Sequence, residues 1–381
     1  MRTPLKYIFL LLLVLPLGGC ALGYYWQAMT GHMDLMRQRR PVPEVVSDPD
    51  TTETVRSQLE RAQAILEFAH AELLLPDNGS YAVYADTGRE YVVWNVFATD
   101  EFSLEPRTWC FPVAGCVSYR GYFSADSAKK FAAKLDADGL DTFVGGVAAY
   151  STLGRFRDPL LNNMMTLSEY RLAGLLIHEL SHQQLYVRDD SSFNESFASF
   201  VEQQGVSDWL GRAGRRQDIC DYRAALIRRA AVRGLLDAAR ARLGELYLKG
   251  LPDADARPLK AEILARLEAD YARLRGTWSE PPYYDGWFDG DLNNARLAAL
   301  STYDEYVPAF EALFNATSGS WREFYARAAA LGALPPEQRV SELDALTSAS
   351  ESAAADPGSR GECRESANSD PVPPPEALPR S

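Results

Sequence analysis

Hydrophobic residues recur at three- and four-residue spacing between Thr52 and Leu75, which is the pattern of an amphipathic helix. The positions that form this stripe are Val55, Leu59, Ala62, Leu66, Ala69 and Leu73. The sequence Pro-Asp-Asn-Gly follows at residues 76–79, and proline and glycine interrupt regular structure. We therefore expect one helix over residues 52–75.

Residues 80–150 have a different pattern, in which short β-branched and aromatic runs are separated by glycine and aspartate. These runs cover residues 81–84, 91–97, 117–123 and 142–147. We expect them to form a small sheet, accompanied by a helix near residues 124–135.

From residue 166 the pattern is helical almost to the end of the chain. Two apolar stripes share one spacing: Leu235, Ala239, Leu243 and Leu246, and then Ile263, Leu267, Tyr271 and Leu274. Gly250 and Pro252 lie between them, so the sequence predicts an αα-hairpin. The expected fold class is α+β, mostly α, with a small β-sheet followed by a helical C-terminal part.

The two ends of the chain differ in composition from the rest. Arg2 and Lys6 precede an apolar run at residues 7–17. This run is shorter than the about 20 residues that span a bilayer, and it has the shape of a secretory signal. Residues 346–381 are rich in serine, alanine, proline and acidic residues, so we expect a disordered tail.

The signal-like segment ends in Leu-Gly-Gly followed by Cys20, which resembles the bacterial lipobox. The resemblance implies a lipoprotein signal peptide at residues 1–19 and a lipid on Cys20. It also implies sorting to the outer membrane, facing the periplasm, because Ala21 rather than aspartate comes next. A plain secretory signal is the alternative. We expect a tether at residues 20–50 and a folded domain at residues 51–345.

The 381 residues carry 52 acidic and 39 basic side chains, which gives a formal net charge of −13. With 46% hydrophobic residues, the composition is that of a folded protein. An acidic chain lacks the basic face that phosphate contact requires, so nucleic acid is excluded as the expected partner.

Export makes disulfides possible. Cys110 and Cys116 flank a turn-like spacer and are expected to form a disulfide. A zinc site built on these two cysteines is disfavoured because no second close pair exists. The sequence does not decide whether Cys220 and Cys363 pair or stay free.

The segment His178-Glu179-Leu-Ser-His182 carries the chemistry. Histidines four residues apart lie on one face of a helix, about 5–6 Å apart at Cβ, and can converge on one Zn²⁺. Glu179 would take the proton from a metal-activated water. Thr166 and Glu169 fit a capping box at the start of this helix. A structural pair of buried histidines is the alternative, but without partners it would be costly.

A catalytic zinc usually takes three protein ligands. His32 lies in the expected tether and His70 in the N-terminal helix, so a downstream carboxylate is the better third ligand. Glu195 is the first choice, because it lies in the first turn of the next helix, thirteen positions after His182. The rival carboxylates are Asp189, Asp190 and Glu202.

Glu195 has an alternative role, since Ser192 and Glu195 also fit a capping box. If Glu195 is instead a ligand, Asn194 and Ser199 are candidates for bracing it, because metal ligands are usually held by further hydrogen bonds.

The histidine motif followed by Asn-Glu-x-x-Ala resembles the glutamate-liganded zinc peptidases. The whole chain resembles a bacterial family of predicted zinc aminopeptidases that are lipoproteins. The matching segments are residues 91–97, 109–123, 144–154, 193–198 and 293–297. The resemblance implies a zincin-like domain that binds one Zn²⁺ through His178, His182 and Glu195, with Glu179 as the base and a peptide as substrate. Glu195 follows the second histidine more closely than in the general pattern, so detailed geometry is not carried over.

The expected function is therefore a zinc-dependent peptidase, and more narrowly an aminopeptidase. Tyr303 is the first candidate for the donor that shares the negative charge of the reacting carbonyl oxygen. Its rivals are Tyr150, Tyr119 and Tyr186. The strand near residues 142–150 is a candidate edge for an extended peptide.

Two other functions stay open. One is a non-catalytic, zinc-stabilised outer-membrane lipoprotein that acts as a scaffold or assembly factor, and the other is a hydrolase of non-peptide substrates. The acidic group that an aminopeptidase needs for the free amine of its substrate is not identified by the sequence.

Overall fold

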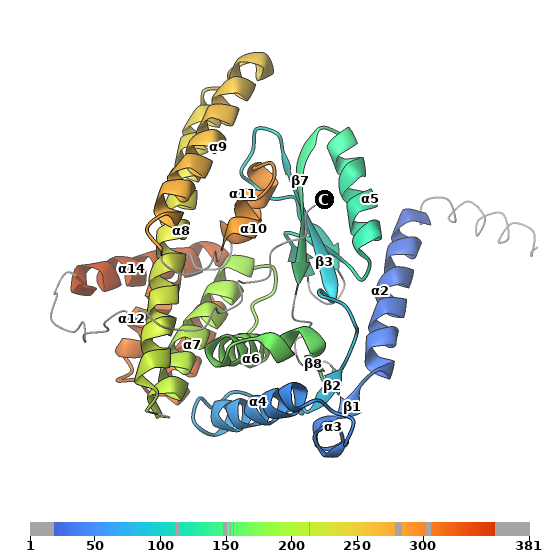
Figure 1. Cartoon of the computed structure of the whole chain (residues 1–381). Helices are drawn as coiled ribbons and strands as arrows, with labels where there is room; N and C mark the ends of the chain where they lie inside the picture. Colours follow the sequence, from blue (N-terminus) through green and yellow to red (C-terminus); the bar gives the residue numbers. More distant parts are fainter. Residues whose placement is uncertain are drawn as a thin grey trace, which may run out of the picture.

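The computed structural model describes residues 19–111, 115–147, 151–152, 154, 156–212, 214–278, 284–301 and 306–354. The molecule is mostly helical with small β-sheets, which confirms the fold class expected from the sequence (Figure 1). No helix in this described part is long and apolar enough to cross a bilayer.

The described chain begins on the outside of the molecule with α2 (Gly19–Arg37), β1 (Arg40–Pro41) and α3 (Val42–Ser47). Each of the two helices still contributes to the main core, through buried Leu35, Val42 and Val45. Residues 20–50, which the sequence assigns to a tether, therefore form regular elements that pack against the folded domain.

The first expected helix is present as α4 (Glu53–Ala71). Thr52 caps it, because its side chain accepts a hydrogen bond from the backbone N–H of Val55. The helix ends four residues before the expected Leu75, and its apolar stripe packs against α6 (Glu169–Gln184).

The main sheet has the order β6 (Arg120–Tyr122), β3 (Val93–Asp100) and β7 (Leu140–Val147), and its strands are antiparallel. The helix α5 (Ala125–Ala137) covers one face, where Ala128 and Ala132 contact Val96. The helix α11 (Asn294–Ser301) lies on the other face, and Figure 1 shows the sheet between these two helices.

The expected run at residues 117–123 divides between two sheets. Its first residue ends β5 (Gly115–Val117), which pairs with β4 (Trp109–Phe111), and the remainder contains β6. A third, smaller sheet joins β1, β2 (Val83–Ala85) and β8 (Leu160–Leu161). The disulfide expected between Cys110 and Cys116 closes the β4–β5 hairpin. Cys220 is disulfide-bonded as well, and Cys363 lies outside the described residues.

Helices α6 and α7 (Ser191–Arg212) form the centre of the helical part. Helix α4 packs against α6, while α12 (Val307–Asn315), α13 (Trp321–Gly332) and α14 (Pro336–Ala354) surround α7. Aromatic rings dominate this second contact, namely Phe193, Phe197 and Phe200 of α7 with Phe310, Phe314 and Phe324. Their burial holds α6 and α7 in a fixed relation. The last described helix, α14, extends beyond residue 345, and residues 355–381 of the expected tail lie outside the described part.

The capping box expected at Thr166 and Glu169 is wrong. A 3₁₀ turn (Asn162–Thr166) precedes α6, whose N-cap is Ser168. The carboxylate of Glu169 is instead engaged by other helices, because it accepts a hydrogen bond from Trp209 Nε1 (2.9 Å) and pairs with two arginines, Arg61 and Arg215. These contacts tie the start of α6 to α4 and to the end of α7.

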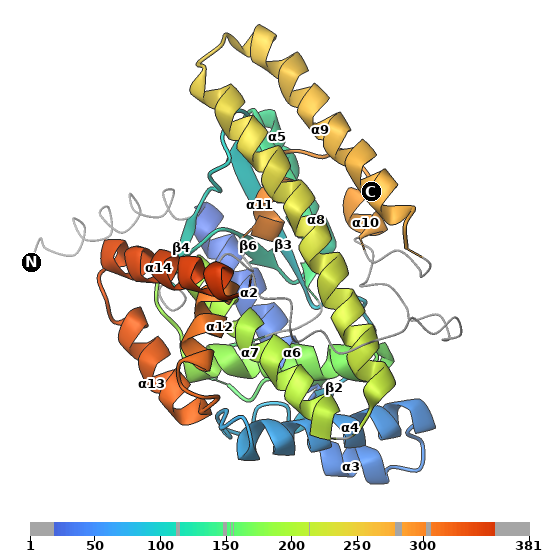
Figure 2. The same cartoon turned by 90° about the vertical axis from the view of Figure 1, so that its left-hand side faces the viewer.

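The expected αα-hairpin is present as α8 (Arg216–Leu248) and α9 (Asp253–Arg275), which project beyond the rest of the molecule (Figure 2). Gly250, at the turn, has a φ of +59°, a conformation that favours glycine. The two stripes meet as expected, because Ala239 and Leu243 of α8 and Leu267 and Tyr271 of α9 are buried in one cluster. A short helix, α10 (Asp285–Phe288), follows.

Candidate metal centre

Two histidines project from the second half of α6, one helical turn apart. The rings of His178 and His182 have centroids 4.9 Å apart and lie nearly perpendicular to each other. Their side chains are only 14% and 9% exposed. The opposite side of α6 is buried in the core through Leu172, Leu176 and Leu180, which fixes the direction of the histidine face.

Glu195 reaches the same point from α7. Its Oε2 atom lies 3.4 Å from His178 Nε2, and its Oε1 atom lies 3.7 Å from His182 Nε2. One ligand atom from each of the three residues lies within 4.8 Å of the other two, so the group could hold a metal ion. Two ligands at about 2.0–2.1 Å from a tetrahedral ion are about 3.3 Å apart, close to the distances found here.

The surroundings of these groups favour a cation between them. Among the described residues, Glu195 Oε2 and His182 Nδ1 are buried without a hydrogen-bond partner of good geometry. A buried carboxylate oxygen without a partner is costly. A divalent ion between the carboxylate and the two imidazole Nε2 atoms would satisfy that oxygen. The donor set of two nitrogens and one oxygen is one that zinc accepts.

The connection between α6 and α7 determines where Glu195 lies. Asn194 is 2% exposed, and its side-chain amide donates to Val187 O and accepts from Val187 N, both at 2.7 Å. Asp190 Oδ1 accepts from the backbone N–H of Phe193 (2.9 Å) and so caps the start of α7. The capping role considered for Glu195 is therefore wrong, because Asp190 already fills it.

Asp190 is also fixed from the C-terminal end of the chain. Arg339 of α14 is 5% exposed, and its Nε donates to Asp190 Oδ2 at 2.7 Å. Two further bonds, to the carbonyl oxygens of Gly332 and Leu334, satisfy the same guanidinium group. The helical C-terminal part thus holds the turn that precedes Glu195.

Glu202 lies two turns after Glu195 on α7 and contacts the other side of the His178 ring. His178 Nδ1 is 3.1 Å from Glu202 Oε2, while Arg229 of α8 pairs with Glu202 Oε1 at 3.9 Å and donates to Ser199 Oγ at 3.5 Å. A proton on Nδ1 leaves the lone pair of Nε2 for a metal. Glu202 is thus a partner of a histidine and lies outside the group of three.

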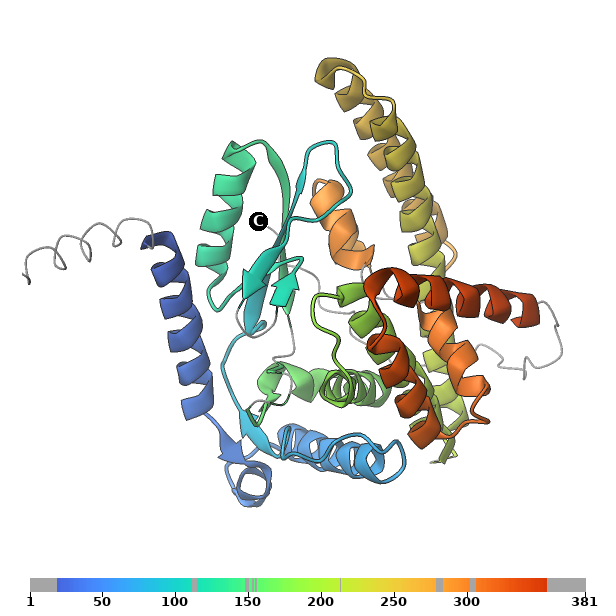
Figure 3. The same cartoon turned by 180° about the vertical axis from the view of Figure 1, so that it is seen from behind.

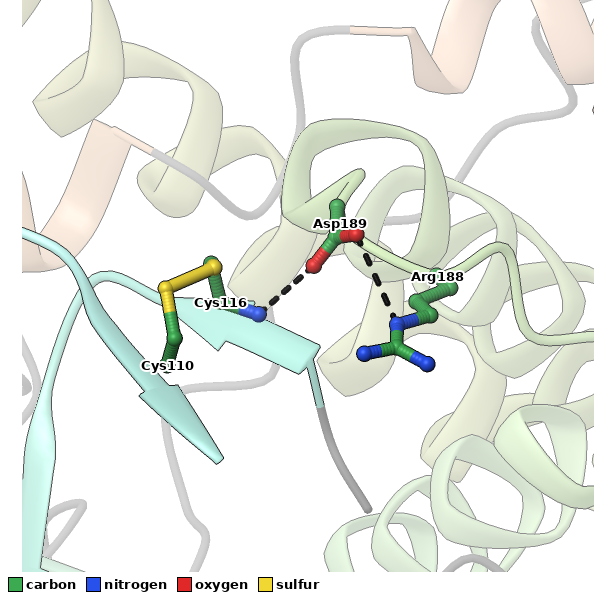
Figure 4. The surroundings of a disulfide bond; sticks show 4 residues. All are labelled: Cys110, Cys116, Arg188 and Asp189. Carbon is green, nitrogen blue, oxygen red and sulfur yellow. Dashed lines mark hydrogen bonds and ion pairs between the residues drawn. A yellow bond between two sulfur atoms is a disulfide. The ribbon is translucent and has the colours of Figure 1, made fainter. Parts of the chain in front are cut away.

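The remaining carboxylate candidate, Asp189, and the two remaining histidines, His70 and His32, also lie outside that group. Asp189 Oδ1 accepts from the backbone N–H of Cys116 (2.6 Å), so it joins the α6–α7 connection to the β4–β5 hairpin (Figure 4). His70 Nδ1 lies 3.2 Å from Leu75 O, and the ring of His32 contacts the ring of Phe156 at a tilted angle. Their placement removes them as candidates for the third ligand.

The hairpin closed by the disulfide fits tightly against this connection. Gly115 has a φ of +76°, and a Cβ atom there would lie 2.4 Å from Asp189 Oδ1. In Figure 4 the Cys110–Cys116 bond lies beside Asp189, which also pairs with Arg188 at 3.6 Å. A side chain larger than hydrogen at position 115 would therefore displace the Asp189 carboxylate from its bond to Cys116 N and would have to adopt a φ that favours glycine.

The charges at the site are strongly coupled. Burial disfavours the charged form of His178, but the close contacts and negative charges of Glu195 and Glu202 outweigh it and raise the pKa of His178 to about 10. Burial lowers the pKa of His182 to about 4. Burial opposes ionisation of Glu195 too, yet its contacts with His178 and His182 hold its pKa below the ordinary value. At neutral pH, without a metal, one histidine is protonated and the other is neutral.

Glu179 lies next to this group and is largely removed from water. Burial raises the pKa of Glu179 to about 7, against the lowering effect of His178. The Ser151 hydroxyl hydrogen-bonds to the Glu179 carboxylate and favours its charged form. Ser151 is positioned by the next residue, Thr152, whose N–H and hydroxyl both donate to the fully buried carboxylate of Asp158, at 2.9 and 2.7 Å.

Sequence reasoning missed Ser151 and Asp158. They lie in the segment after β7, which carries no spacing motif, and their role depends on where the described residues of this segment meet α6. Tyr81 was missed as a site residue as well. It is 0% exposed, and burial together with the charges of Glu179 and Asp158 raises the pKa of its phenol.

Two of the four candidate tyrosine donors are close to the site. Crowding around Tyr119 raises the pKa of its phenol, and the charge of Glu195 adds to this effect. Burial and then Glu195 also raise the pKa of Tyr186. Tyr303 and Tyr150 lie outside the described residues.

Comparison with protein families gives a match over most of the chain. The sequence model of the family described as "Putative aminopeptidase" matches residues 23–343. The chain belongs to this family. Comparisons with curated proteins and with solved structures gave no match. Membership of an aminopeptidase family indicates peptidase activity and a peptide substrate. The match runs from α2 to α14 and so includes every element that positions the three groups.

Proposed function

We propose that the protein is a zinc-dependent aminopeptidase in which His178, His182 and Glu195 hold the metal. The observation that carries this proposal is the approach of two imidazole Nε2 atoms to one carboxylate, at 3.4 and 3.7 Å, in a chain of the aminopeptidase family. Three protein ligands leave a fourth position for water. When bound, Zn²⁺ would supply the Lewis acidity that activates this water and polarises a peptide carbonyl.

Glu179 is the general base in this proposal. It takes the proton of the attacking water and delivers it to the nitrogen of the broken peptide bond. Burial raises the pKa of Glu179 to about 7 in the metal-free protein, and a bound cation would lower it, so the carboxylate is charged and able to accept a proton at neutral pH. Ser151 orients the carboxylate by donating to it.

A phenol would share the negative charge that develops on the carbonyl oxygen. Tyr119 and Tyr186 are supported by their nearness to Glu195. Tyr303, the first choice from the sequence, remains a proposal. Single Tyr→Phe variants separate the three, since loss of the donor lowers kcat and leaves zinc content unchanged.

An extended peptide would lie along β7. In the described sheet β7 pairs on one side with β3 and has no strand partner on the other. The chain continues from β7 to Ser151, which contacts Glu179. A peptide that pairs with this free edge would pass the candidate metal centre.

The proposed location is the outer membrane, on the periplasmic side, with residues 1–19 removed and a lipid on Cys20. The charged start, the apolar run and the Leu-Gly-Gly-Cys end of the signal support this. Mass spectrometry of the protein purified from membranes would detect the acylated Cys20.

The decisive experiment measures zinc content and peptide hydrolysis together. Glu179→Gln should keep one zinc per chain and lower kcat by about 10²–10⁴-fold, the contribution typical of a general base. His178→Ala should lose both the metal and the activity. A peptide library then shows whether cleavage starts at a free N-terminus.

The outcomes separate the enzyme from the alternatives. Full activity in Glu179→Gln would refute the assigned base. A protein that binds zinc and is stabilised by it, but cleaves no peptide, would instead support the scaffold role.

A further inference from the structure

Helix α2 is held against the sheet by one face. Its ring contact is Tyr24 on Tyr122, at 5.5 Å between centroids, and Gln27 Oε1 accepts from Phe123 N at 3.2 Å. Gly31 allows close approach, because a Cβ atom there would lie 2.2 Å from the Phe123 ring. Leu35 is fully buried. Residues 24, 27, 31 and 35 repeat at helical spacing, so they define a single inner face.

The opposite face is apolar and exposed. Tyr25, Trp26, Met29 and Met33 are 46%, 66%, 54% and 46% exposed, and their spacing places them on one side of α2. We call these four residues the outer stripe. Phe156, 54% exposed, extends it through its contact with His32 of α2, at 4.7 Å between ring centroids.

This concentration of exposed apolar side chains on and beside α2 is unusual for the molecule. Of the twelve large apolar side chains that are most exposed in the described part, four form the outer stripe and Phe156 is a fifth. Apolar residues scattered singly on a surface need no explanation, whereas a contiguous patch indicates an interaction site. Figure 3 shows α2 at the outer edge of the molecule, on the side away from α13 and α14.

The position of the stripe in the chain indicates what covers it. Cys20, the proposed site of lipidation, is in the first turn of α2. At a rise of about 1.5 Å per residue, the stripe lies about 7–20 Å along the helix from Cys20. Tryptophan and tyrosine favour the boundary between headgroups and acyl chains. Acyl chains on Cys20 would bring this face to a bilayer.

The charges beside α2 suit an anionic surface. Helix α5 carries three exposed lysines, Lys129, Lys130 and Lys134, and two exposed aspartates, Asp126 and Asp136, so its side chains are net positive in a chain of net charge −13. Arg120 joins the two helices, since its guanidinium lies 4.0 Å from the Tyr24 ring and 4.6 Å from the ring of Phe131 on α5. Lysines near a membrane surface are attracted to anionic lipids.

We infer that α2 lies on the bilayer surface, with the outer stripe in the lipid and the lysines of α5 near anionic headgroups. The inference rests on the proposed lipid anchor. It adds a second contact, which fixes the orientation of the protein on the membrane.

The test uses the full chain, purified from membranes and placed in vesicles of phosphatidylethanolamine and phosphatidylglycerol at about 3:1. Some of the lipid is brominated near the headgroup and quenches tryptophan on contact. All seven tryptophans lie in the described residues. Trp26 is the one tryptophan among the twelve most exposed large apolar side chains described above. Quenching should fall at least threefold in Trp26→Phe, which keeps an apolar side chain and removes the reporter.

A triple variant tests the stripe itself. Tyr25→Ser with Met29→Ser and Met33→Ser should lower the quenching of Trp26 at least threefold. The matched control changes three exposed apolar residues elsewhere, Ile227, Leu248 and Val340, to serine and should leave quenching unchanged. Replacing phosphatidylglycerol with phosphatidylcholine should lower quenching at least twofold, and no change would refute the role of the lysines.

Two results would overturn the inference. One is unquenched Trp26 in a protein whose Cys20 is shown by mass spectrometry to be acylated. The other is a dimer in detergent that dissociates in the triple variant, which would mean that a second copy covers the stripe. Quenching of Trp26 without acylation of Cys20 would refute the anchor and support the stripe. Peptide hydrolysis is measured separately, so a failure of the proposed enzyme activity is not confused with either result.

Discussion

The two histidines of the candidate centre differ at the nitrogen that faces away from Glu195. His178 Nδ1 has the carboxylate of Glu202 at 3.1 Å, whereas His182 Nδ1 is buried without a partner among the described residues. The carboxylate holds the proton of His178 on Nδ1 and makes Nε2 a better ligand. The two imidazoles should therefore contribute unequally to metal affinity.

Removal of the charge on Glu202 tests this view. Glu202→Gln keeps the size of the side chain but weakens the bond to His178, so metal affinity should fall by about 10–100-fold, as is usual for such partners. Competition with a coloured chelator at several pH values gives the affinity corrected for protonation of His178, which is the quantity to compare, because a lower pKa of His178 would offset part of the loss at pH 7.5. Glu195→Gln should cost more, because it removes a proposed ligand. Equal affinity in wild type and Glu202→Gln would show that the partner is not needed.

The histidine pKa values predict that metal binding releases a proton. A pKa of about 10, raised by Glu195 and Glu202 against the effect of burial, keeps His178 protonated at pH 8 in the metal-free protein. Burial lowers the pKa of His182 to about 4, so this ring is already neutral. A metal binds only neutral imidazole, so binding should release about one proton, and affinity should rise about tenfold per pH unit up to about pH 10.

Calorimetry in buffers of different ionisation enthalpy counts this proton. The count at pH 8 should be at least one in the wild type, because His178 loses its proton and ionisation of a metal-bound water would add to the count. It should fall in Glu202→Gln, because the loss of one negative charge lowers the pKa of His178. A count of zero in the wild type would contradict the assigned protonation state.

At the scale of single elements, the turn between α6 and α7 is the part on which the site depends most. The side-chain amide of Asn194 replaces a backbone partner for both the N–H and the C=O of Val187. Asn194→Ala would leave these two groups unpaired in a buried setting. At about 1–3 kcal/mol for each of the two groups, the free energy of unfolding should fall by about 2–6 kcal/mol.

Urea denaturation of the metal-free protein measures this loss, and Asn194→Asp is the matched control. Aspartate can accept from Val187 N but cannot donate to Val187 O, so it should recover part of the stability. Because the turn also positions Glu195, metal affinity should fall in the order wild type, Asp variant, Ala variant. Unchanged stability in Asn194→Ala would show that water replaces the lost bonds.

Local sequence patterns predicted the helices and strands well and the contacts between them poorly. Helical spacing placed His178 and His182 on one face, and the short polar connection brought Glu195 within reach of them. The role of Glu169 was predicted wrongly, because a capping box is a local pattern while Trp209, Arg61 and Arg215 reach this carboxylate from other elements. Ser151 contacts Glu179 only through the tertiary path of the chain after β7.

In the whole molecule, the αα-hairpin and the main sheet meet at a junction of buried polar groups. Lys260 of α9 donates to Glu101 O at 2.7 Å and to Asp141 Oδ2 at 2.6 Å. Asn294 of α11 bonds the same two residues, through its side chain to Glu101 O (2.9 Å) and its backbone N–H to Asp141 Oδ2 (2.8 Å). Asn293 adds a bond to Thr142 O at 2.8 Å. The start of segment 293–297, one of those on which the resemblance to the aminopeptidase family rests, thus serves this junction, and its hydrogen bonds within the described residues lead to the sheet and the hairpin.

Because this junction is separate from the metal centre, stability and metal binding should be separable. Lys260 is 7% exposed, so Lys260→Met would leave the Asp141 carboxylate without its cation, a change that typically costs about 3–5 kcal/mol. Hydrogen exchange should become faster in α9 and α11, while metal affinity stays within about twofold of the wild type. Arg257→Met is the control, since its pair with Glu101 is exposed and should matter much less. If Lys260→Met instead lowered metal affinity as much as Glu202→Gln, the hairpin would have to be counted among the elements that shape the site.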